Sequence, residues 1–242
     1  MRYYLDTKGF GQDNKRMNNN KMKRIALIHA LPFSIDPVRQ AFEEHWPEAE
    51  LVNLLDDSLS VDLQRAQVLS EDITNRIVTL GEYALSIGAD GILYTCSAFG
   101  KAIDIVKQNL NIPVLKPNEA MFEEVLQFEG NIGMLATFGP SVPSMEAEFN
   151  EYSAELKKNV PLKTILVDQA MTMLSGGDTA GHNRTLRQAA AEHFADFDIV
   201  MLAQFSTAQA SAAVSEVFKG TILTSPNSAV LKLKHDIVPE GT

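Results

Sequence analysis

The sequence contains a single cysteine, Cys96, among its 242 residues. One cysteine rules out an internal disulfide and a cysteine-rich metal site, and the five histidines show no metal-ligand spacing. A net charge of −10 leaves no basic surface to hold nucleic acid or an anionic membrane. No apolar run approaches the roughly 20 residues that a membrane-spanning helix needs. These absences predict a protein without a metal, in a reducing compartment and by default the cytoplasm, with neither nucleic acid nor membrane as partner.

What is present is the composition of an ordinary globular protein, with 45% apolar and 21% charged residues. A chain of 26.6 kDa can bury a full core, either as one large domain or as two small lobes. The first 22 residues differ from the rest, because they are polar, include the run Asn18-Asn19-Asn20 and have little to bury. We expect residues 1–22 to be a disordered tail outside the fold.

From Arg24 onward, short apolar strands alternate with amphipathic helices, and the pattern begins again at Asn131. Three anchors recur at separations of 107, 108 and 109 residues: Ile25 with Ile132, Asp90 with Asp198, and Pro117-Asn118 with Pro226-Asn227. Such regular spacing indicates an internal repeat.

The repeat predicts an α/β fold of two lobes related by a pseudo-twofold axis, with an active-site cleft between them. Helical crossovers imply a roughly four-stranded parallel sheet in each lobe, flanked by helices. We assign 23–121 to lobe 1 and 122–220 to lobe 2. The C-terminal segment 221–242 can return to lobe 1.

The stretch 90–100 organises the first lobe. Three apolar residues after Gly91 predict a buried strand, and Thr95-Cys96-Ser97 follows at the point where a helix begins. Ligand sites of open α/β sheets form at such carboxyl ends of strands. The helix start offers unpaired N–H groups that favour a thiolate at Cys96 and a carboxylate beside it. A buried, chemically inert cysteine is the alternative interpretation.

With these features the chain resembles the aspartate/glutamate/hydantoin racemase superfamily, which includes arylmalonate decarboxylase and maleate isomerase. The resemblance covers about Arg24 to Lys234 and rests on the Thr95–Ala98 turn, on the segment 132–137 (IGMLAT) and on the paired Pro-Asn turns. It implies a cofactor-independent enzyme, often dimeric, that moves a proton at a carbon next to a carboxylate. Typical members place one cysteine on each side of the substrate. The resemblance puts the first on Cys96 and the carboxylate at Ser97, Ala98 and Thr137.

The sequence departs from the family pattern in the second half, where Gln204-Phe205-Ser206-Thr207 replaces the expected Gly-Cys-Thr. A glutamine amide has no pKa near neutrality and cannot readily exchange a proton with carbon. His29 ends the first strand on the same sheet edge, so it is a candidate acid/base for the second face. It could equally be a packed histidine bonded to its neighbours. The hydroxyls of Ser97, Thr137, Ser206 and Thr207 could serve as helix caps, as ligand donors, or as both.

We therefore predict a single-cysteine, racemase- or isomerase-type enzyme acting on a small anionic acid, either an amino acid or a hydantoin-like compound. One alternative is a one-thiol decarboxylase similar to arylmalonate decarboxylase. Another is a protein that closes on a small carboxylate without chemistry. The predicted site consists of two acid/base candidates, Cys96 and His29, and of ligand-binding positions Ser97, Ala98, Thr137, Gln204, Ser206 and Thr207.

Overall fold

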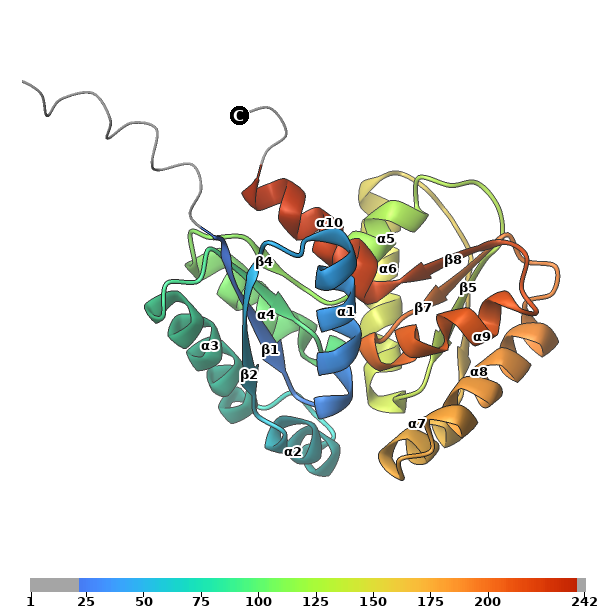
Figure 1. Ribbon diagram of the computed structural model, residues 1–242, viewed down its shortest axis with the longest axis horizontal. Helices are drawn as coiled ribbons and strands as arrows, with labels where there is room; N and C mark the ends of the chain where they lie inside the picture. The colour runs from blue at the N-terminus through green and yellow to red at the C-terminus, as the bar shows by residue number, and fades with distance from the viewer. Residues whose placement is uncertain (1–21, 239–242) are drawn as a thin grey trace, which may run out of the picture.

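The computed structural model describes residues 22–238, and the predicted tail therefore lies, apart from Met22, outside the described residues. Within them the strands form two four-stranded sheets, ordered β2-β1-β3-β4 and β6-β5-β7-β8, and all neighbouring strands pair in parallel. Figure 1 shows the two sheets in separate lobes that lie side by side. The predicted α/β fold with one parallel sheet in each lobe is confirmed.

Lobe 1 contains the first four strands and helices of the chain. Its strands are β1 (Arg24–His29), β2 (Glu50–Leu55), β3 (Gly91–Tyr94) and β4 (Val114–Leu115). Its helices are α1 (Ile35–His45), α2 (Ser58–Ala66), α3 (Glu71–Ser86) and α4 (Gly100–Asn109). Helix α3 is capped by Ser70, whose hydroxyl accepts a hydrogen bond from the Ile73 N–H.

Lobe 2 repeats this order of strands. Its strands are β5 (Ile132–Ala136), β6 (Leu162–Leu166), β7 (Ile199–Leu202) and β8 (Thr221–Thr224). Its helices are α6 (Val142–Glu155), α7 (Asp168–Ser175), α8 (Thr179–His193) and α9 (Ser211–Ser215). In both lobes the two central strands are buried along their length, as expected for parallel strands covered by helices on both faces.

Two helices cross between the lobes. Helix α5 (Glu119–Val125) follows β4 of lobe 1, but Met121 and Phe122 pack into the core of lobe 2 with β5 and β7. Helix α10 (Ser225–Ile237) follows β8 of lobe 2, and Val230 and Leu233 join the core of lobe 1 with β1 and α1. Figure 1 shows α10 in red beside the blue α1. Each lobe is therefore completed by a helix that follows a strand of the other.

The carboxyl ends of the central strands lead into short 3-10 turns that lie between the lobes. These turns are η1 (Pro32–Ser34), η2 (Ser97–Phe99), η3 (Gly139–Ser141) and η4 (Phe205–Ala210). Phe205 is buried and packs into the α1–α10 cluster of lobe 1, although it belongs to a turn of lobe 2. No helix within residues 22–238 is long and apolar enough to cross a membrane.

Candidate active site

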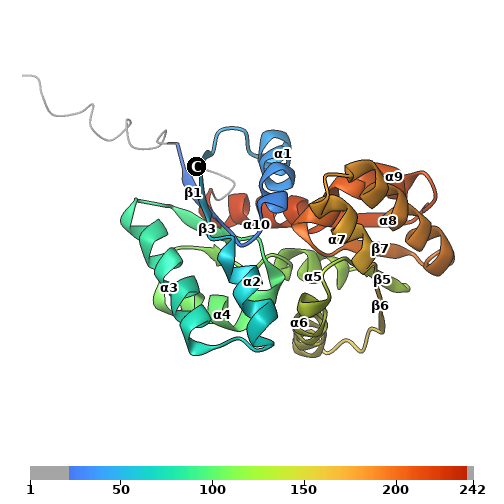
Figure 2. The same ribbon diagram turned by 90° about the horizontal axis from the view of Figure 1, so that it is seen from below.

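A small cavity of about 30 Å³ lies between the strand-end turns of the two lobes. Lobe 1 lines it with Leu31, Ser34, Thr95, Cys96 and Ser97, and lobe 2 with Phe138, Met171, Gln204, Phe205 and Ser206. Figure 2 looks toward this region, where α2 of lobe 1 faces α7 of lobe 2. Four predicted site residues, Cys96, Ser97, Gln204 and Ser206, thus meet at one cavity. A cavity of this size can hold water but not an amino acid, so an amino acid would fit between the turns only if the lobes separated.

Cys96 lies two residues after the end of β3 and directly before η2, with an extended backbone and a half-buried side chain. Burial raises the pKa of its thiol to about 11, while the Ala98 N–H and the Ser60 hydroxyl act in the opposite direction. The sequence predicted a thiol acidified by a helix start. In the closed protein burial outweighs that effect, because a three-residue 3-10 turn separates Cys96 from α4 and the helix field falls off within a turn.

Ser97 and Ala98 have different environments. Ser97 is buried against the cavity that Cys96 lines. Ala98 does not line this cavity, and its contribution is the backbone N–H that bonds the thiol. The hydroxyl beside the thiol comes from Ser60 on α2, and its single proton is donated either to the sulfur or to the Ala30 carbonyl, which lies 3.0 Å away. Ser60 was not predicted, because it lies 36 residues before Cys96 in a segment whose helix the sequence reading missed.

Gln204 is bonded within its own lobe. Its Oε1 accepts hydrogen bonds from the Thr137 N–H at 2.7 Å and from the Thr137 hydroxyl at 2.8 Å. Its Nε2 donates to Ser141 Oγ at 2.8 Å and more weakly to the Phe138 carbonyl at 3.4 Å. The donors of Thr137 that the resemblance assigns to a substrate carboxylate are therefore occupied by the Gln204 amide in this closed arrangement.

Ser206 and Thr207 follow Gln204 but point to different neighbours. Thr207 is fully buried, and its hydroxyl bonds the Gln204 carbonyl at 2.6 Å and the Gln204 N–H at 3.2 Å. Its local role is to cap η4, which is one of the two roles that the sequence left open. Ser206 lines the cavity opposite Cys96 and Ser97.

His29 is fully buried behind the cavity and does not line it. Its Nε2 lies 2.9 Å from Asn53 Oδ1, while Nδ1 lies 3.0 Å from Ser34 Oγ and 2.9 Å from Thr95 Oγ1. Because Asn53 Oδ1 is an acceptor, Nε2 carries the proton and Nδ1 accepts from one hydroxyl. Burial lowers the pKa of His29 to about 4, so the imidazole is neutral at pH 7. Its link to the cavity runs through Ser34 and Thr95.

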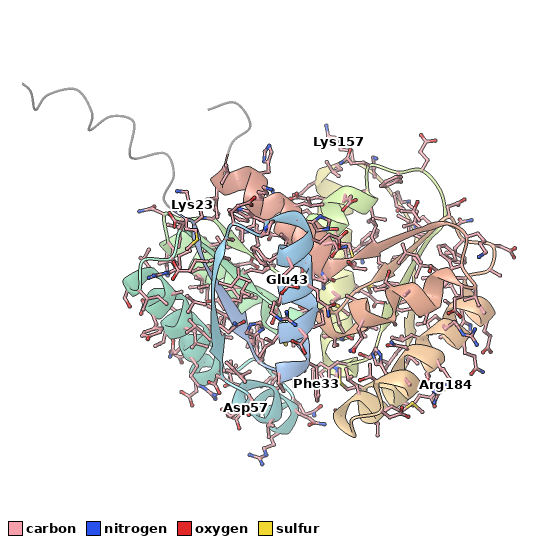
Figure 3. The ribbon with its side chains drawn as sticks, in the orientation of Figure 1. Lys23, Phe33, Glu43, Asp57, Lys157 and Arg184 are labelled. Carbon is pink, nitrogen blue, oxygen red and sulfur yellow. The ribbon has the colours of Figure 1, made fainter. Side chains whose placement is uncertain are left out.

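The chemical capacity of the cavity follows from this inventory. Among the described residues that line it, Cys96 is the one with an ionisable side chain; the others carry hydroxyls, an amide or apolar groups. In the view of Figure 3, Phe33 of η1 is seen between Asp57 of lobe 1 and Arg184 of lobe 2. The arrangement suits one thiol acting on a small molecule that is held by hydroxyls and backbone N–H groups.

The fold was compared with solved structures. Glutamate racemase isoform RacE1 from Bacillus anthracis matches with a TM-score of 0.67 at 14% identity, over 88% of this chain and 80% of that one. Picrophilus torridus aspartate racemase matches with 0.65 at 14% identity, over 86% and 92%. Allantoin racemase from Klebsiella pneumoniae matches with 0.65 at 11% identity, over 88% and 86%. At such identities the likeness shows a shared fold.

The sequence was compared with family models and with curated proteins. No curated protein matches the chain. The family model described as Asp/Glu/Hydantoin racemase matches residues 36–232, which cover both lobes except β1 and extend into α10. A match over most of the chain places the protein by sequence as well as by fold, and the chain belongs to the Asp/Glu/hydantoin racemase family.

Proposed function

We propose that this protein is a cofactor-independent, racemase-type enzyme that transfers a proton at the carbon next to the carboxylate of a small acid. The observation that carries the proposal is the position of Cys96. It is the acid/base group of an inter-lobe cavity in a chain of the racemase family. The substrate class is an amino acid, or a hydantoin-like compound whose ring carbonyl takes the place of the carboxylate, in keeping with the glutamate, aspartate and allantoin racemases that share the fold.

In the proposed reaction, the hydroxyls of Ser97 and Ser206 and the N–H groups of the neighbouring turns hold the substrate carboxylate. When the lobes open, water reaches the Cys96 thiol and its pKa falls from the value that burial imposes. The thiolate then takes the proton from the α-carbon, and the electron pair of the C–H bond moves into the enolate-like intermediate. Return of a proton to that carbon completes the exchange.

Racemisation also needs a proton donor for the opposite face. We assign this step to a water molecule or to His29 acting through the hydroxyls of Ser34 and Thr95, both of which line the cavity. His29 would then be a positioning residue, since its ring does not reach the cavity itself. The amide of Gln204 cannot serve this step, because it neither gains nor loses a proton near neutral pH.

A second candidate function is a one-thiol decarboxylase, and the raised pKa of Cys96 favours it. Loss of carbon dioxide from a malonate-like acid would leave the electron pair of the broken C–C bond on the α-carbon. The neutral thiol would then donate its proton to that carbon, and the resulting thiolate would be reprotonated by water. This reaction requires a proton donor on a single face of the substrate, which matches the single ionisable side chain, Cys96, among the residues that line the cavity.

Proton NMR in D₂O with aspartate, glutamate, allantoin and phenylmalonate tests these proposals. Loss of the α-proton signal of one of the first three, without release of carbon dioxide, supports the racemase-type reaction. Decarboxylation of phenylmalonate supports the lyase. Binding without either reaction, measured by calorimetry for the same compounds, overturns both and leaves a protein that binds small carboxylates. The Cys96→Ala variant, checked for an unchanged circular dichroism spectrum, is the control for background exchange.

A further inference from the structure

The Cys96 cavity has an apolar side as well as a polar one. Its apolar lining consists of Leu31 from lobe 1, Phe138 and Met171 from lobe 2, and Phe205 of η4. None of the ten described residues that line the cavity carries a carboxylate, ammonium or guanidinium group. A substrate group that enters this side is therefore surrounded by hydrocarbon and aromatic rings.

Separation of the lobes would change the width of the cavity but not the composition of its walls. Leu31 lies between β1 and η1 in lobe 1. Phe138 directly precedes η3 in lobe 2, and Met171 lies on α7 of the same lobe. Because each of these side chains belongs to one lobe, both walls keep an apolar side chain when the lobes move apart.

Most polar groups of the cavity are already used inside the protein. The hydroxyls of Ser34 and Thr95 are hydrogen-bonded to the buried imidazole behind them, and the Gln204 amide is bonded within its own lobe. Among the described lining residues, this leaves the hydroxyls of Ser97 and Ser206 for a ligand. With the N–H groups of the neighbouring turns they suffice for one carboxylate, the one next to the reacting carbon.

The charges around the cavity do not favour a second carboxylate. Asp57 precedes α2 and Asp168 begins α7, and these two helices face each other in Figure 2. Two lysines between the lobes, Lys101 and Lys116, line a separate groove that shares no lining residue with the cavity. Lys116 is also paired there with Glu148 at 3.3 Å. A carboxylate on the substrate side chain would lose its hydration without gaining a cationic partner, which is strongly unfavourable.

We propose that the Cys96 site selects acids whose α-substituent is uncharged and apolar, and that Leu31, Phe138 and Met171 determine this selectivity. The proposal rests on the proposed function, because it takes the α-carboxylate and the reacting carbon to lie beside Cys96. The α-substituent then packs against the apolar walls, where burial of its surface favours binding. Aspartate and glutamate carry a second carboxylate, for which this site offers no cation among the described lining residues.

Leucine, asparagine and aspartate test the proposal, because their side chains are similar in size and differ in charge and polarity. NMR in D₂O measures the kcat/KM of α-proton exchange. We expect it to be highest for leucine, about tenfold lower for asparagine and at least about a hundredfold lower for aspartate. Calorimetry should give the same order of affinities. Equal values for leucine and aspartate, or a preference for aspartate, would overturn the proposal.

Arginine variants locate the selectivity. Met171→Arg places a cation in the apolar wall and should raise the kcat/KM ratio of aspartate to leucine at least about tenfold. Thr172→Arg adds the same charge at the next, exposed position of α7 and should change this ratio by less than about twofold. Leu31→Arg adds the cation from lobe 1 and provides the test if Met171→Arg fails to fold. An unchanged ratio in the folded variants of Met171 and Leu31 would overturn their assigned role.

The same measurements separate this proposal from the proposed function. Exchange of aspartate that equals or exceeds that of leucine would leave the racemase-type reaction in place and overturn the selectivity. Binding in the order leucine, asparagine, aspartate without exchange of any of them would support the apolar site and count against the proposed reaction. Failure of leucine to bind would overturn the selectivity, whatever the result with the compounds that test the function.

Discussion

Lobe 1 and lobe 2 end their third strands at equivalent positions but with different side chains, Cys96 after β3 and Gln204 after β7. The thiol of Cys96 lines the cavity and touches its surroundings through two donors, the Ala98 N–H and the Ser60 hydroxyl. The amide of Gln204 also borders the cavity, but its bonds run back to Thr137 and the η3 turn.

In each lobe, nevertheless, one buried polar side chain connects the turns at the strand ends by hydrogen bonds. In lobe 1 this side chain is His29, at the end of the first strand, which forms hydrogen bonds with Ser34 and Thr95. In lobe 2 this side chain is Gln204, after the third strand, which donates a hydrogen bond to Ser141. Ser141 occupies the position in the second repeat that Ser34 occupies in the first. Because His29 performs this task in lobe 1, the third-strand position there can hold a reactive group. In lobe 2 the same position is used for structure.

The largest effect is expected from removing the thiol, which would make the two lobes equally inert. Cys96→Ala should lower the rate of α-proton exchange, or of decarboxylation, by about 10²–10⁴-fold, the usual loss for an acid/base group. NMR in D₂O measures the rate, and thermal unfolding checks that the variant is folded. Unchanged turnover would show that the chemistry does not depend on this turn.

The role of His29 in lobe 1 can be tested through the pH dependence of the free energy of unfolding. Burial lowers the pKa of His29 to about 4 from 6.5. The unfolded chain therefore binds a proton below pH 6.5 that the folded chain refuses until about pH 4. The contribution of His29 to the free energy of unfolding should therefore be complete above pH 6.5. It should fall by about 3 kcal/mol as the pH decreases to 4.

Urea unfolding of the wild type and of His29→Gln between pH 7 and 4 measures this contribution. The variant should lose less unfolding free energy than the wild type as the pH falls, because it lacks the His29 ring. Some loss should remain, because other acid-sensitive groups, including the buried His182, are present in both proteins. Parallel losses in the two proteins would mean that the His29 ring does not stay neutral in the folded state. His235→Gln, at an exposed position, is the matched control.

The role of Gln204 in lobe 2 is tested by replacing its amide with a thiol. Gln204→Cys removes the amide that holds Thr137 and Ser141, which should cost about 1–3 kcal/mol of unfolding free energy. It should also supply a second acid/base group and raise racemisation relative to one-sided exchange. Chiral chromatography of the product measures this ratio. Gln204→Ala is the control, since it loses the same hydrogen bonds without gaining a thiol, and it should show no such rise.

The smallest expected effect concerns Ser60, which supports the thiol from α2. Ser60→Ala removes one of the two donors that lower the pKa of Cys96. Alkylation of Cys96 by iodoacetamide at pH 8 should slow by about twofold to fivefold, because a smaller fraction is thiolate. Ser86→Ala, at an exposed position of α3, should react like the wild type. An unchanged rate in Ser60→Ala would remove this serine from the site.

The strands were predictable from the sequence because they are short apolar runs whose ends carry polar residues. The three apolar residues after Gly91, for example, belong to β3 as predicted. Helices α2 and α7 were not predicted. Both begin within three residues of the end of an edge strand, and both are stabilised by a few buried side chains, Leu59 and Leu63 in α2 and Ala170 in α7. Helices this short form through packing rather than through intrinsic propensity.

The candidate site was predictable in part for the same reason. Parallel strands bring their carboxyl ends to one edge, so Cys96 and Gln204 could be placed at the cleft from the strand pattern alone. Ser60 and Met171 come from the two unpredicted helices, so nothing in the strand pattern marked them. The joining of Lys116 and Glu148 was equally hidden, because it depends on how closely α6 approaches the end of β4.

By itself, the sequence determined a duplicated, parallel α/β architecture with one thiol and no equivalent thiol in the second half, because apolar periodicity and residue identity are local properties. Tertiary structure decided the chemical state of the groups in that architecture. Burial made the Cys96 thiol a weak acid and kept His29 neutral, and the packing of the two lobes paired the buried Glu148 with Lys116. Charge and protonation depend on the distance to every neighbour and to water, and only the folded chain sets those distances.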